Sequence, residues 1–344
     1  MKTHGLNLVL CLALFVIQGY CATPQYVGFE STEEESVEDK LVGNETKGKT
    51  FVEKLGKLSV DHTFLVNERG EKVILKGVSF GWHNWWPRFY NANVVRTLAN
   101  DWECAVVRAA MGVDPDRGYI SDPKFSTECV TRVVDAAIEN GIYVIIDWHS
   151  HTIRTKEAVG FFSEMARKYK DYPNVIYEIF NEPEKDSWHD VKAYSEEVIK
   201  AIRETDKSNI ILVGSPHWDQ DVHLVADDPI SGYENIMYTL HFYAATHGDF
   251  LRERGDYAIS RGIPLFVSEC AGMEATGNGP INAEEWGKWV DWMAENKISW
   301  AAWSVSDKDE TCSMLLPSAS SEGSWSDRDL KEWGKIVQVE LLKD

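Results

Sequence analysis

The chain has 344 residues, 44% of them apolar, and is long enough to bury the core of one barrel-sized domain. Its formal net charge of −20 argues against nucleic acid and anionic membrane surfaces as partners, because both repel a strongly acidic protein. An uncharged polymer is compatible with that charge. Four cysteines follow residue 21, and spacing alone leaves their pairing open: Cys104, Cys129, Cys270 and Cys312.

The first 54 residues are not expected to contribute to the folded core. Residues 1–21 have the pattern of a secretory signal peptide, with a basic start, the apolar stretch Leu8–Ile17 and small residues before Ala22. The apolar stretch is too short to span a bilayer. Residues 22–54 are polar and acidic, a composition that cannot offset the entropy cost of ordering, so we expect a disordered leader. We therefore predict a secreted, extracellular protein whose folded domain covers residues 55–344.

The folded domain is predicted to begin with a β-hairpin and to continue as repeated strand–helix units. The alternating segment 58–75 contains Asn67-Glu68-Arg69-Gly70, a turn sequence typical of hairpins. Short apolar strands follow at Ile74–Ser79, Ala105–Ala110, Tyr143–Trp148, Val175–Phe180, Ile210–Val213, Ile236–His241, Leu265–Ser268 and Trp300–Ser304. Amphipathic helical patterns lie between them, among others at Val130–Glu139, Ala158–Tyr169, Val191–Glu204 and Ala283–Glu295.

Eight strand–helix units in one domain of this length predict an α/β fold, a (β/α)8 TIM barrel with a short N-terminal hairpin. The alternative is a doubly wound open sheet, which would need a glycine-rich phosphate loop after the first strand. Gly77-Val78-Ser79-Phe80 stands at that place and does not fit such a loop.

Polar or aromatic residues follow nearly every predicted strand. Because the active sites of such barrels lie at the C-terminal ends of the strands, these residues outline a candidate cleft. They are Trp82, Trp85, Arg108, His149, Asn181, Glu182, Trp218, His241, Tyr243, Glu269 and Trp303. Glu182 and Glu269 each follow an apolar strand, where an unpaired buried carboxylate costs several kcal/mol. Two carboxyl groups that face each other across a cleft are typical of the active site of a glycosidase.

The ordered set of these motifs resembles glycoside hydrolase family 5, and within it the bacterial-type cellulases. The resemblance runs from about residue 58 to the C-terminus. It is carried by Arg108 in Val-Val-Arg-Ala-Ala-Met, His149 in Ile-Asp-Trp-His, Asn181-Glu182-Pro183, Trp218-Asp219-Gln220-Asp221, His241-Phe242-Tyr243, Glu269, and Trp303 with the segment to Glu310. The resemblance implies a TIM-barrel endo-β-1,4-glucanase that hydrolyses internal bonds of a β-glucan.

The resemblance also implies roles for single residues. Glu182 is expected to be the acid/base and Glu269 the nucleophile of a retaining, double-displacement mechanism, with carboxyl groups about 5 Å apart. We expect burial and the charge of Glu269 to raise the pKa of Glu182. The expected supporting residues are Arg108, His149, Asn181, His241 and Tyr243. The expected sugar-binding residues are Trp85, Trp218, Trp303, Lys308 and Glu310.

The chain departs from the family pattern at two positions. Many relatives carry a tyrosine where this chain has Gly112 after Met111, and the residue after the nucleophile is commonly aromatic where this chain has Cys270. The first departure removes an active-site hydroxyl, and the second changes a wall of the cleft.

Several residues in the sequence also allow other interpretations. His149 and His151 imitate a metal-binding pair, but no other histidine-rich strand end completes a site, so we expect no metal and no cofactor. Glu178 lies inside a strand and is expected to pair with a charge in the barrel. Three tryptophans at helical spacing are expected to pack inside the fold: Trp286, Trp289 and Trp292. The sequence leaves open whether the protein is instead a mannanase, a lichenase, a xyloglucanase or a non-catalytic glucan-binding barrel. We expect it to be a monomer.

Overall fold

The computed structural model describes residues 48–343. The predicted signal peptide and residues 22–47 of the predicted leader lie outside this range. Eight parallel strands form the barrel: β3 (Lys76–Phe80), β4 (Val106–Gly112), β5 (Tyr143–His149), β6 (Val175–Glu178), β7 (Ile211–Val213), β8 (Ile236–Thr239), β10 (Leu265–Ala271) and β11 (Trp300–Val305). The two-residue strand β9 (Phe242–Tyr243) also pairs with β10 and makes the ninth strand of the sheet. Because β11 pairs with both β10 and β3, the sheet closes on itself. The predicted barrel is therefore confirmed, and the open sheet is excluded.

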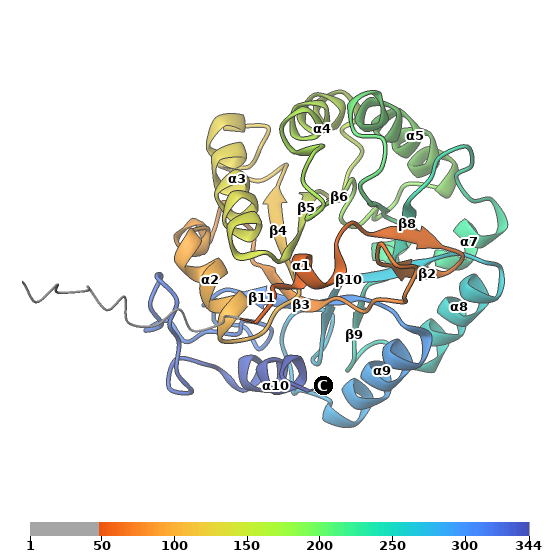
Figure 1. Ribbon diagram of the computed structural model, residues 1–344. Coiled ribbons are helices and arrows are strands. Elements are labelled where there is room, and N and C mark those ends of the chain that lie inside the picture. Colours follow the sequence, from red (N-terminus) through yellow and green to blue (C-terminus); the bar gives the residue numbers. More distant parts are fainter. Residues whose placement is uncertain (1–47, 344) are drawn as a thin grey trace, which may run out of the picture. The chain divides into compact units, whose positions relative to one another are not determined.

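Helices surround the barrel, as Figure 1 shows for the described residues. They are α2 (Ala92–Asn100), α3 (Pro123–Asn140), α4 (Thr155–Tyr169), α5 (Trp188–Thr205), α7 (Val222–Asp227), α8 (Asp249–Ser260), α9 (Ala283–Asn296) and α10 (Glu332–Leu341), with the short α6 (Pro216–Asp219) and the 3-10 turn Pro87–Phe89. The bounds of α3 follow from its sequence. The Asp122 side chain accepts a hydrogen bond from the Phe125 amide, Pro123 opens the helix, and Gly141 ends it at a φ of 64°.

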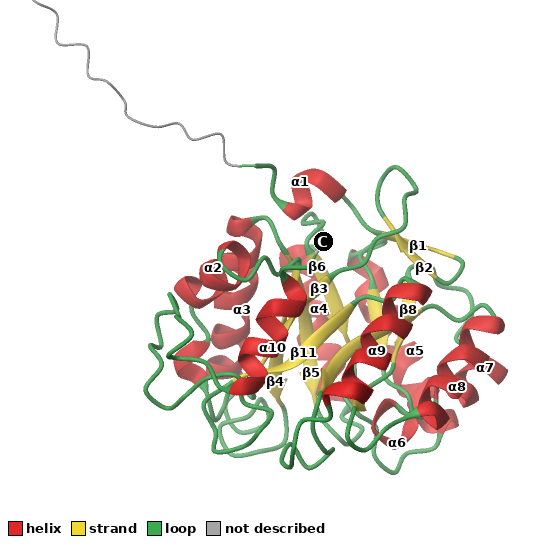
Figure 2. Cartoon of the chain, turned by 90° about the horizontal axis from the view of Figure 1, so that it is seen from below, coloured by secondary structure: helices red, strands yellow, loops and turns green. Residues whose placement is uncertain are grey.

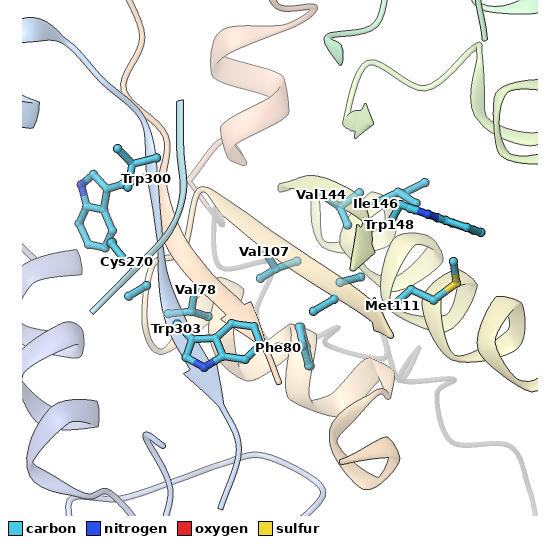
Figure 3. Close-up of a cluster of buried hydrophobic side chains, with 14 of the residues drawn as sticks. Val78, Phe80, Val107, Met111, Val144, Ile146, Trp148, Cys270, Trp300 and Trp303 are labelled. Carbon is cyan, nitrogen blue, oxygen red and sulfur yellow. The ribbon is translucent and has the colours of Figure 1, made fainter. Parts of the chain in front are cut away.

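The apolar core between strands and helices is built from residues that point outward from the barrel. Val78, Val107, Val144 and Ile146 come from three successive strands and belong to this cluster, part of which Figure 3 shows. The predicted packing tryptophans Trp286, Trp289 and Trp292 are buried in the same cluster. The four cysteines are buried and unpaired. None of the described helices is long and apolar enough to cross a membrane.

The barrel interior is layered, because alternate residues of a strand face inward. Near the N-terminal ends of the strands the inner layer is apolar, formed by Val106, Ile145, Ile176, Leu212, Met237 and Phe266. Two residues further along the strands the inner layer is polar and still buried: Ser79, Arg108, Asp147, Glu178, Thr239 and Ser268. Buried polar groups are costly unless they are paired, so this polar layer forms the base of the candidate site.

The N-terminal hairpin is present, and the chain reverses once more before the predicted turn. β1 (Ser59–Asp61) pairs antiparallel with β2 (Phe64–Val66), and the chain reverses at His62, whose φ is 53°. The predicted turn Asn67–Gly70 also forms after β2, closed by a hydrogen bond from the Gly70 amide to the Asn67 carbonyl, and Val66 and Lys72 pair antiparallel across it. In Figure 2 the hairpin and α1 lie at the end of the barrel opposite α6.

The predicted end of the disordered leader at residue 54 is wrong. Residues Phe51–Leu55 form helix α1, which begins with a capping box: Thr50 accepts from the Glu53 amide, and the Glu53 carboxylate accepts from the Thr50 amide. The Val52 amide donates to the Gly141 carbonyl, so α1 is tied to the end of α3. The ordered domain therefore begins before Phe51.

Candidate active site

Arg108 lies at the centre of the polar layer, fully buried. Its Nε donates to Glu178 at 2.7 Å and its Nη1 to Glu269 at 3.0 Å, while Nη2 donates to Asn181 at 2.6 Å and lies 3.0 Å from Asp147. A guanidinium stays charged at all physiological pH values and offers donors in a fixed planar fork. Arg108 therefore gives the three carboxylates a permanent counter-charge. Glu178 is the structural partner that the sequence predicted.

Glu269 lies at the end of β10, the seventh barrel strand, and both of its carboxylate oxygens accept hydrogen bonds. Arg108 donates to Oε2, and the Tyr243 hydroxyl donates to Oε1 at 2.7 Å. The pairing of β10 with β11 shifts register between Val267 and Cys270. This irregularity lets the neighbours Ser268 and Glu269 both reach into the site, where regular alternation would send one of them outward.

Glu182 follows β6, the fourth barrel strand, and its partners are histidines. His241 Nδ1 lies 2.9 Å from Oε1 of Glu182, and His151 Nδ1 lies 3.7 Å from Oε2. On the other side of the His241 ring, Nε2 lies 2.8 Å from Ser268 Oγ, which itself donates to Glu178. Because the Ser268 hydroxyl proton is used there, Ser268 accepts from His241, and Nε2 carries a proton.

The two glutamates face each other across the cleft, and an oxygen of one lies within 4.8 Å of an oxygen of the other. This confirms the predicted proximity. The raised pKa expected for Glu182 is wrong. Burial raises the pKa of Glu182, but the hydrogen bond from His241 and its charge outweigh burial and bring the pKa below its ordinary value. Burial and the Glu182 charge raise the pKa of Glu269 against the opposing effect of Arg108.

His241 explains this outcome. Burial lowers its pKa, but the carboxylates of Asp219, Glu178 and Glu182 outweigh burial and raise the pKa well above its ordinary value. A cationic His241 beside Glu182 favours the ionised form of that carboxylate. Both directions favour a proton on Nδ1 of His241, 2.9 Å from Oε1 of Glu182.

The cleft has two halves that meet at Glu182. The Trp303 half is lined, among others, by Trp82, Trp85, His149, Glu269, Trp303, Lys308 and Glu310. The Trp218 half is lined by His151, Glu182, Trp218, Gln220, His241, Tyr243, His247, Ala275 and Thr276. All five predicted sugar-binding residues therefore lie along this cleft. Trp85 is 53% exposed and Trp218 42% exposed, so both offer a free aromatic face.

His149 is a neutral, fixed member of the Trp303 half. Its ring stacks on Trp303 at 5.3 Å and meets the edge of Trp82 at 4.2 Å. Its Nδ1 lies 2.6 Å from Asp147, which fixes the orientation of the ring. Burial, followed by the charge of Arg108, lowers the pKa of His149 well below its ordinary value.

Asn181, also one of the predicted supporting residues, is fully buried. Its oxygen accepts from Arg108, whereas its Nδ2 has no partner within the described residues. A buried amide without an acceptor is costly, so this group is set to donate to a bound ligand.

The two departures from the family pattern have different structural consequences. A Cβ atom at Gly112 would lie 2.5 Å from Asn84 Oδ1 and 2.8 Å from Trp82 Cε3. Trp82 and Asn84 therefore fill the space beside residue 112. Cys270 is buried, and its thiol donates to the Ala301 carbonyl, behind the cleft wall.

Sequence reasoning missed four residues of the site, namely Asp147, His151, Asp219 and Ser268. Asp147 and Ser268 had a readable signal, because each lies two residues beyond an apolar inner position of a predicted strand. Two groups bring ligand-type atoms within 4.8 Å of one another: Glu178, Asp219 and His241, and Glu182, His241 and Glu269. These atoms already have partners within the protein: Glu178 and Glu269 bind Arg108, His241 binds Glu182 and Ser268, and Asp219 binds Ser215 and Thr239.

The fold and this cluster define a class: (β/α)8-barrel hydrolases with paired carboxyl groups at the C-terminal ends of the strands. The family model "Cellulase (glycosyl hydrolase family 5)" matches residues 66–309, and the chain belongs to that family.

Individual relatives agree with this membership. Endoglucanase Z of Dickeya dadantii is 47% identical over 276 residues, which are 78% of this chain and 63% of that protein. A solved structure from Cytophaga hutchinsonii has a TM-score of 0.84 at 47% identity, covering 85% of this chain and 96% of that one. The catalytic domain of an endoglucanase from Thermobifida fusca has a TM-score of 0.82 at 34% identity, covering 86% and 100%. The chain thus spans less than two thirds of the length of Endoglucanase Z.

Proposed function

We propose that this chain is an endo-β-1,4-glucanase that hydrolyses internal β-1,4-glucosidic bonds with retention of anomeric configuration. The carrying observation is the pair Glu182 and Glu269, whose oxygens lie within 4.8 Å. Retaining glycosidases hold their carboxyl groups about 5–5.5 Å apart, whereas inverting enzymes need about 6.5–9.5 Å to admit a water. The proposal is also supported by the similarity to Endoglucanase Z, which is 47% identical to this chain over 276 residues.

The partners of the two glutamates suggest how the work is divided between them. Glu269 accepts from Arg108 and Tyr243, which aim it and favour its ionised form, as a nucleophile needs. Glu182 exchanges a proton with His241 across 2.9 Å, as an acid/base needs. The free Nδ2 of Asn181 is placed to donate to a sugar hydroxyl next to the reacting carbon.

The reaction then has two steps. In the first, Glu269 attacks the anomeric carbon, the glycosidic bond breaks, and Glu182 gives the leaving oxygen a proton that His241 stores in the free enzyme. In the second, Glu182 takes a proton from water, and the hydroxide attacks the same carbon and releases Glu269. Arg108 keeps its charge through both steps.

Hydrolysis of a neutral soluble glucan tests the activity. Purified protein should release reducing ends from hydroxyethylcellulose and should lower its viscosity early, because internal cuts shorten chains fastest. Glu182→Gln and Glu269→Gln should remove both signals, whereas Glu184→Gln, a control two residues from Glu182, should retain them. Folded protein without turnover would favour a non-catalytic glucan-binding barrel, and faster hydrolysis of mannan, lichenan or xyloglucan would favour a related glycanase.

Stereochemistry is tested separately. Proton NMR of fresh cello-oligosaccharide digests should show the β-anomer first, followed by slow mutarotation. The α-anomer as first product would exclude the retaining mechanism.

We also propose that the protein is secreted and acts as a monomer. The support for secretion is the basic and apolar pattern of residues 1–21. Expression of the full chain in a secreting host should release protein that begins near Ala22. Light scattering should give the mass of one chain.

A further inference from the structure

Asp219 is a buried acid to which the proposed reaction assigns no task. Its side chain is fully buried between β7, β8 and the Trp218 half of the cleft. The Ser215 amide donates to its Oδ1 at 2.6 Å, the Thr239 hydroxyl donates to its Oδ2 at 2.6 Å, and His241 Nε2 lies 3.3 Å from Oδ2. An ionised carboxylate accepts hydrogen bonds from the amide and the hydroxyl and attracts a charged His241 ring, so this set of neighbours fits the charged form of Asp219.

Asp219 also belongs to the turn that presents Trp218. His217, Trp218 and Asp219 all have left-handed backbones, with φ values of 57°, 54° and 59°. Such a run is strained for residues other than glycine and persists only where its surroundings hold it. Here the Ser215 amide binds Asp219 Oδ1, and the Trp218 amide donates to the Pro183 carbonyl beside Glu182. The two oxygens of the Asp219 carboxylate therefore have different contacts: Oδ1 holds the turn, and Oδ2 faces His241.

We infer that Asp219 is a positioning residue that joins the Trp218 turn to the Glu182–His241 pair by placing a negative charge against Nε2 of His241. This inference rests on the proposed function, because it concerns the proton that Glu182 delivers. Asp219 does not itself line the cleft, and it reaches Glu182 only through His241, which does line it, so it acts through the histidine.

The surroundings of His241 make Asp219 its main counter-charge on the Nε2 side. From β6, Glu178 lies 3.8 Å from Nε2, but two Arg108 nitrogens already bind that carboxylate. From the segment after β6, Glu182 lies at Nδ1, and from β10 come Ser268 at Nε2 and Glu269 further off. Arg108 and Asp147 lie in the same layer, and His151 lies 3.7 Å from the other oxygen of Glu182. Asp219 is the one of these carboxylates that lies close to Nε2 and has no arginine partner.

Burial raises the pKa of Asp219 well above its ordinary value, and the charge of Glu182 adds to this, while His241, the Thr239 hydroxyl and the Ser215 amide oppose the rise and favour the ionised form. With Asp219 ionised, its charge strengthens proton binding at His241 and at Glu182 beyond it. Removing a negative charge weakens every nearby proton site. The basic limb of the kcat/KM profile, where the enzyme loses the proton of the Glu182–His241 pair, should therefore move toward lower pH in Asp219→Asn.

The test is the pH profile of kcat/KM on an uncharged cello-oligosaccharide for wild type and Asp219→Asn. The near-isosteric asparagine should move the basic limb by roughly 1 pH unit toward acid, because a charge within about 4–6 Å commonly changes a pKa by that much or more. Asp221→Asn is the matched control. Asp221 lies in the same loop and is similarly buried, but it pairs with His217 and Arg254. The basic limb of Asp221→Asn should lie within a few tenths of a pH unit of the wild-type limb.

A second variant covers the case in which Asp219→Asn does not fold. Thr239→Val removes a donor to Asp219 at nearly constant shape, which disfavours the charged carboxylate and should move the basic limb in the same direction by less. An unmoved basic limb in folded Asp219→Asn, or equal movement in Asp221→Asn, would overturn the inference while leaving the activity intact. A wild type without activity on any β-glucan would overturn the proposed function instead.

Discussion

The two glutamates occupy equivalent places at the ends of β6 and β10, yet their partners differ in kind. Glu269 is held by Arg108, whose charge is permanent, and by a phenol, Tyr243. Glu182 is held by His241, whose charge depends on pH and on a network reaching Asp219. Both carboxyl groups are deeply buried, so burial alone does not distinguish them. The partners distinguish them: one carboxylate is fixed as an acceptor, and the other can exchange a proton.

The largest effects on activity are expected when either carboxylate is removed. Glu269→Ala loses the covalent step and should lower kcat on every substrate by on the order of 10⁴-fold or more. Glu182→Ala should depend on the leaving group, because an activated aryl glycoside needs little protonation, so the glycosyl-enzyme forms and accumulates. Kinetics on aryl cellobiosides of graded leaving-group acidity measure both effects.

Azide, a small nucleophile that needs no base, sharpens the same comparison. Azide should rescue Glu182→Ala and give a β-glycosyl azide, since it attacks the intermediate from the face that water uses. In Glu269→Ala, azide should enter from the vacated face and give the α-anomer. If both variants give the same anomer, the roles assigned here to Glu182 and Glu269 are wrong.

The second prediction tests the permanent charge on the Glu269 side. Arg108→Met leaves Asp147, Glu178 and Glu269 buried without a cation and should lower the free energy of unfolding by about 3–5 kcal/mol. The control is Arg69→Met, which removes an ion pair whose side chains are each 60% exposed and should cost at most about 1 kcal/mol. Urea titration measures both. Similar losses in the two variants would contradict the central role of Arg108.

The third prediction concerns the titratable charge on the Glu182 side. The pKa of folded His241 is raised, so its contribution to stability is complete below the ordinary histidine pKa of about 6.5 and is lost as pH rises through the folded value. The destabilisation by His241→Asn should therefore shrink as pH rises above about 6.5, whereas that of Arg108→Met should not shrink, because the buried carboxylates that lose their cation are increasingly charged at higher pH. Denaturation of both variants between pH 6 and 9 checks the difference. A constant penalty for His241→Asn would mean that its charge contributes nothing.

The sequence was sufficient to predict the barrel because each strand is a short, nearly continuous apolar run, and the helices between the strands are amphipathic. It was sufficient to locate both glutamates, since strand ends can be read from the pattern. It did not predict that Ser268 and Glu269 both face inward, because a register shift in β10 depends on pairing with β11. Helix α1 was missed although Thr50 and Glu53 have the spacing of a capping box.

The direction of the pKa of Glu182 could not be predicted either, since it depends on a histidine 59 positions away and on the neighbours of that histidine. Likewise, nothing in the pattern of Trp218-Asp219 indicated that the aspartate points inward while the tryptophan stays 42% exposed, because a left-handed turn separates their directions. The apolar pattern of the strands thus predicts where the site residues lie, whereas their charge depends on tertiary contacts.

The fourth prediction is smaller and tests the hydroxyl beside Glu269. Tyr243→Phe removes a hydrogen bond to a charged oxygen, which contributes about 1.5–3 kcal/mol, so kcat/KM should fall about 10- to 100-fold. Because the lost donor favoured the ionised form of Glu269, the pKa of Glu269 should rise and the acidic limb of the pH profile should move to higher pH. An acidic limb that moves to lower pH would contradict the contact.

The smallest effect is expected at Gly112, in the wall of the Trp303 half. In Gly112→Ala the new methyl group would lie 2.5 Å from Asn84 Oδ1 and 2.8 Å from Trp82 Cε3, so both side chains must move. Overpacking of this kind costs about 1–3 kcal/mol. Because Trp82 also contacts His149 and Trp85, its displacement should raise KM more than it lowers kcat.

Gly160→Ala in α4 is the matched control for Gly112→Ala, since nothing lies within 4 Å of the added methyl group. There the same substitution should stabilise the protein by about 0.5–1 kcal/mol, because alanine loses less backbone entropy than glycine in a helix. Thermal melting and steady-state kinetics measure both variants. If Gly112→Ala is as stable as Gly160→Ala and has the wild-type KM, residue 112 has room for a side chain, and the packing of Trp82 against it does not shape this half of the cleft.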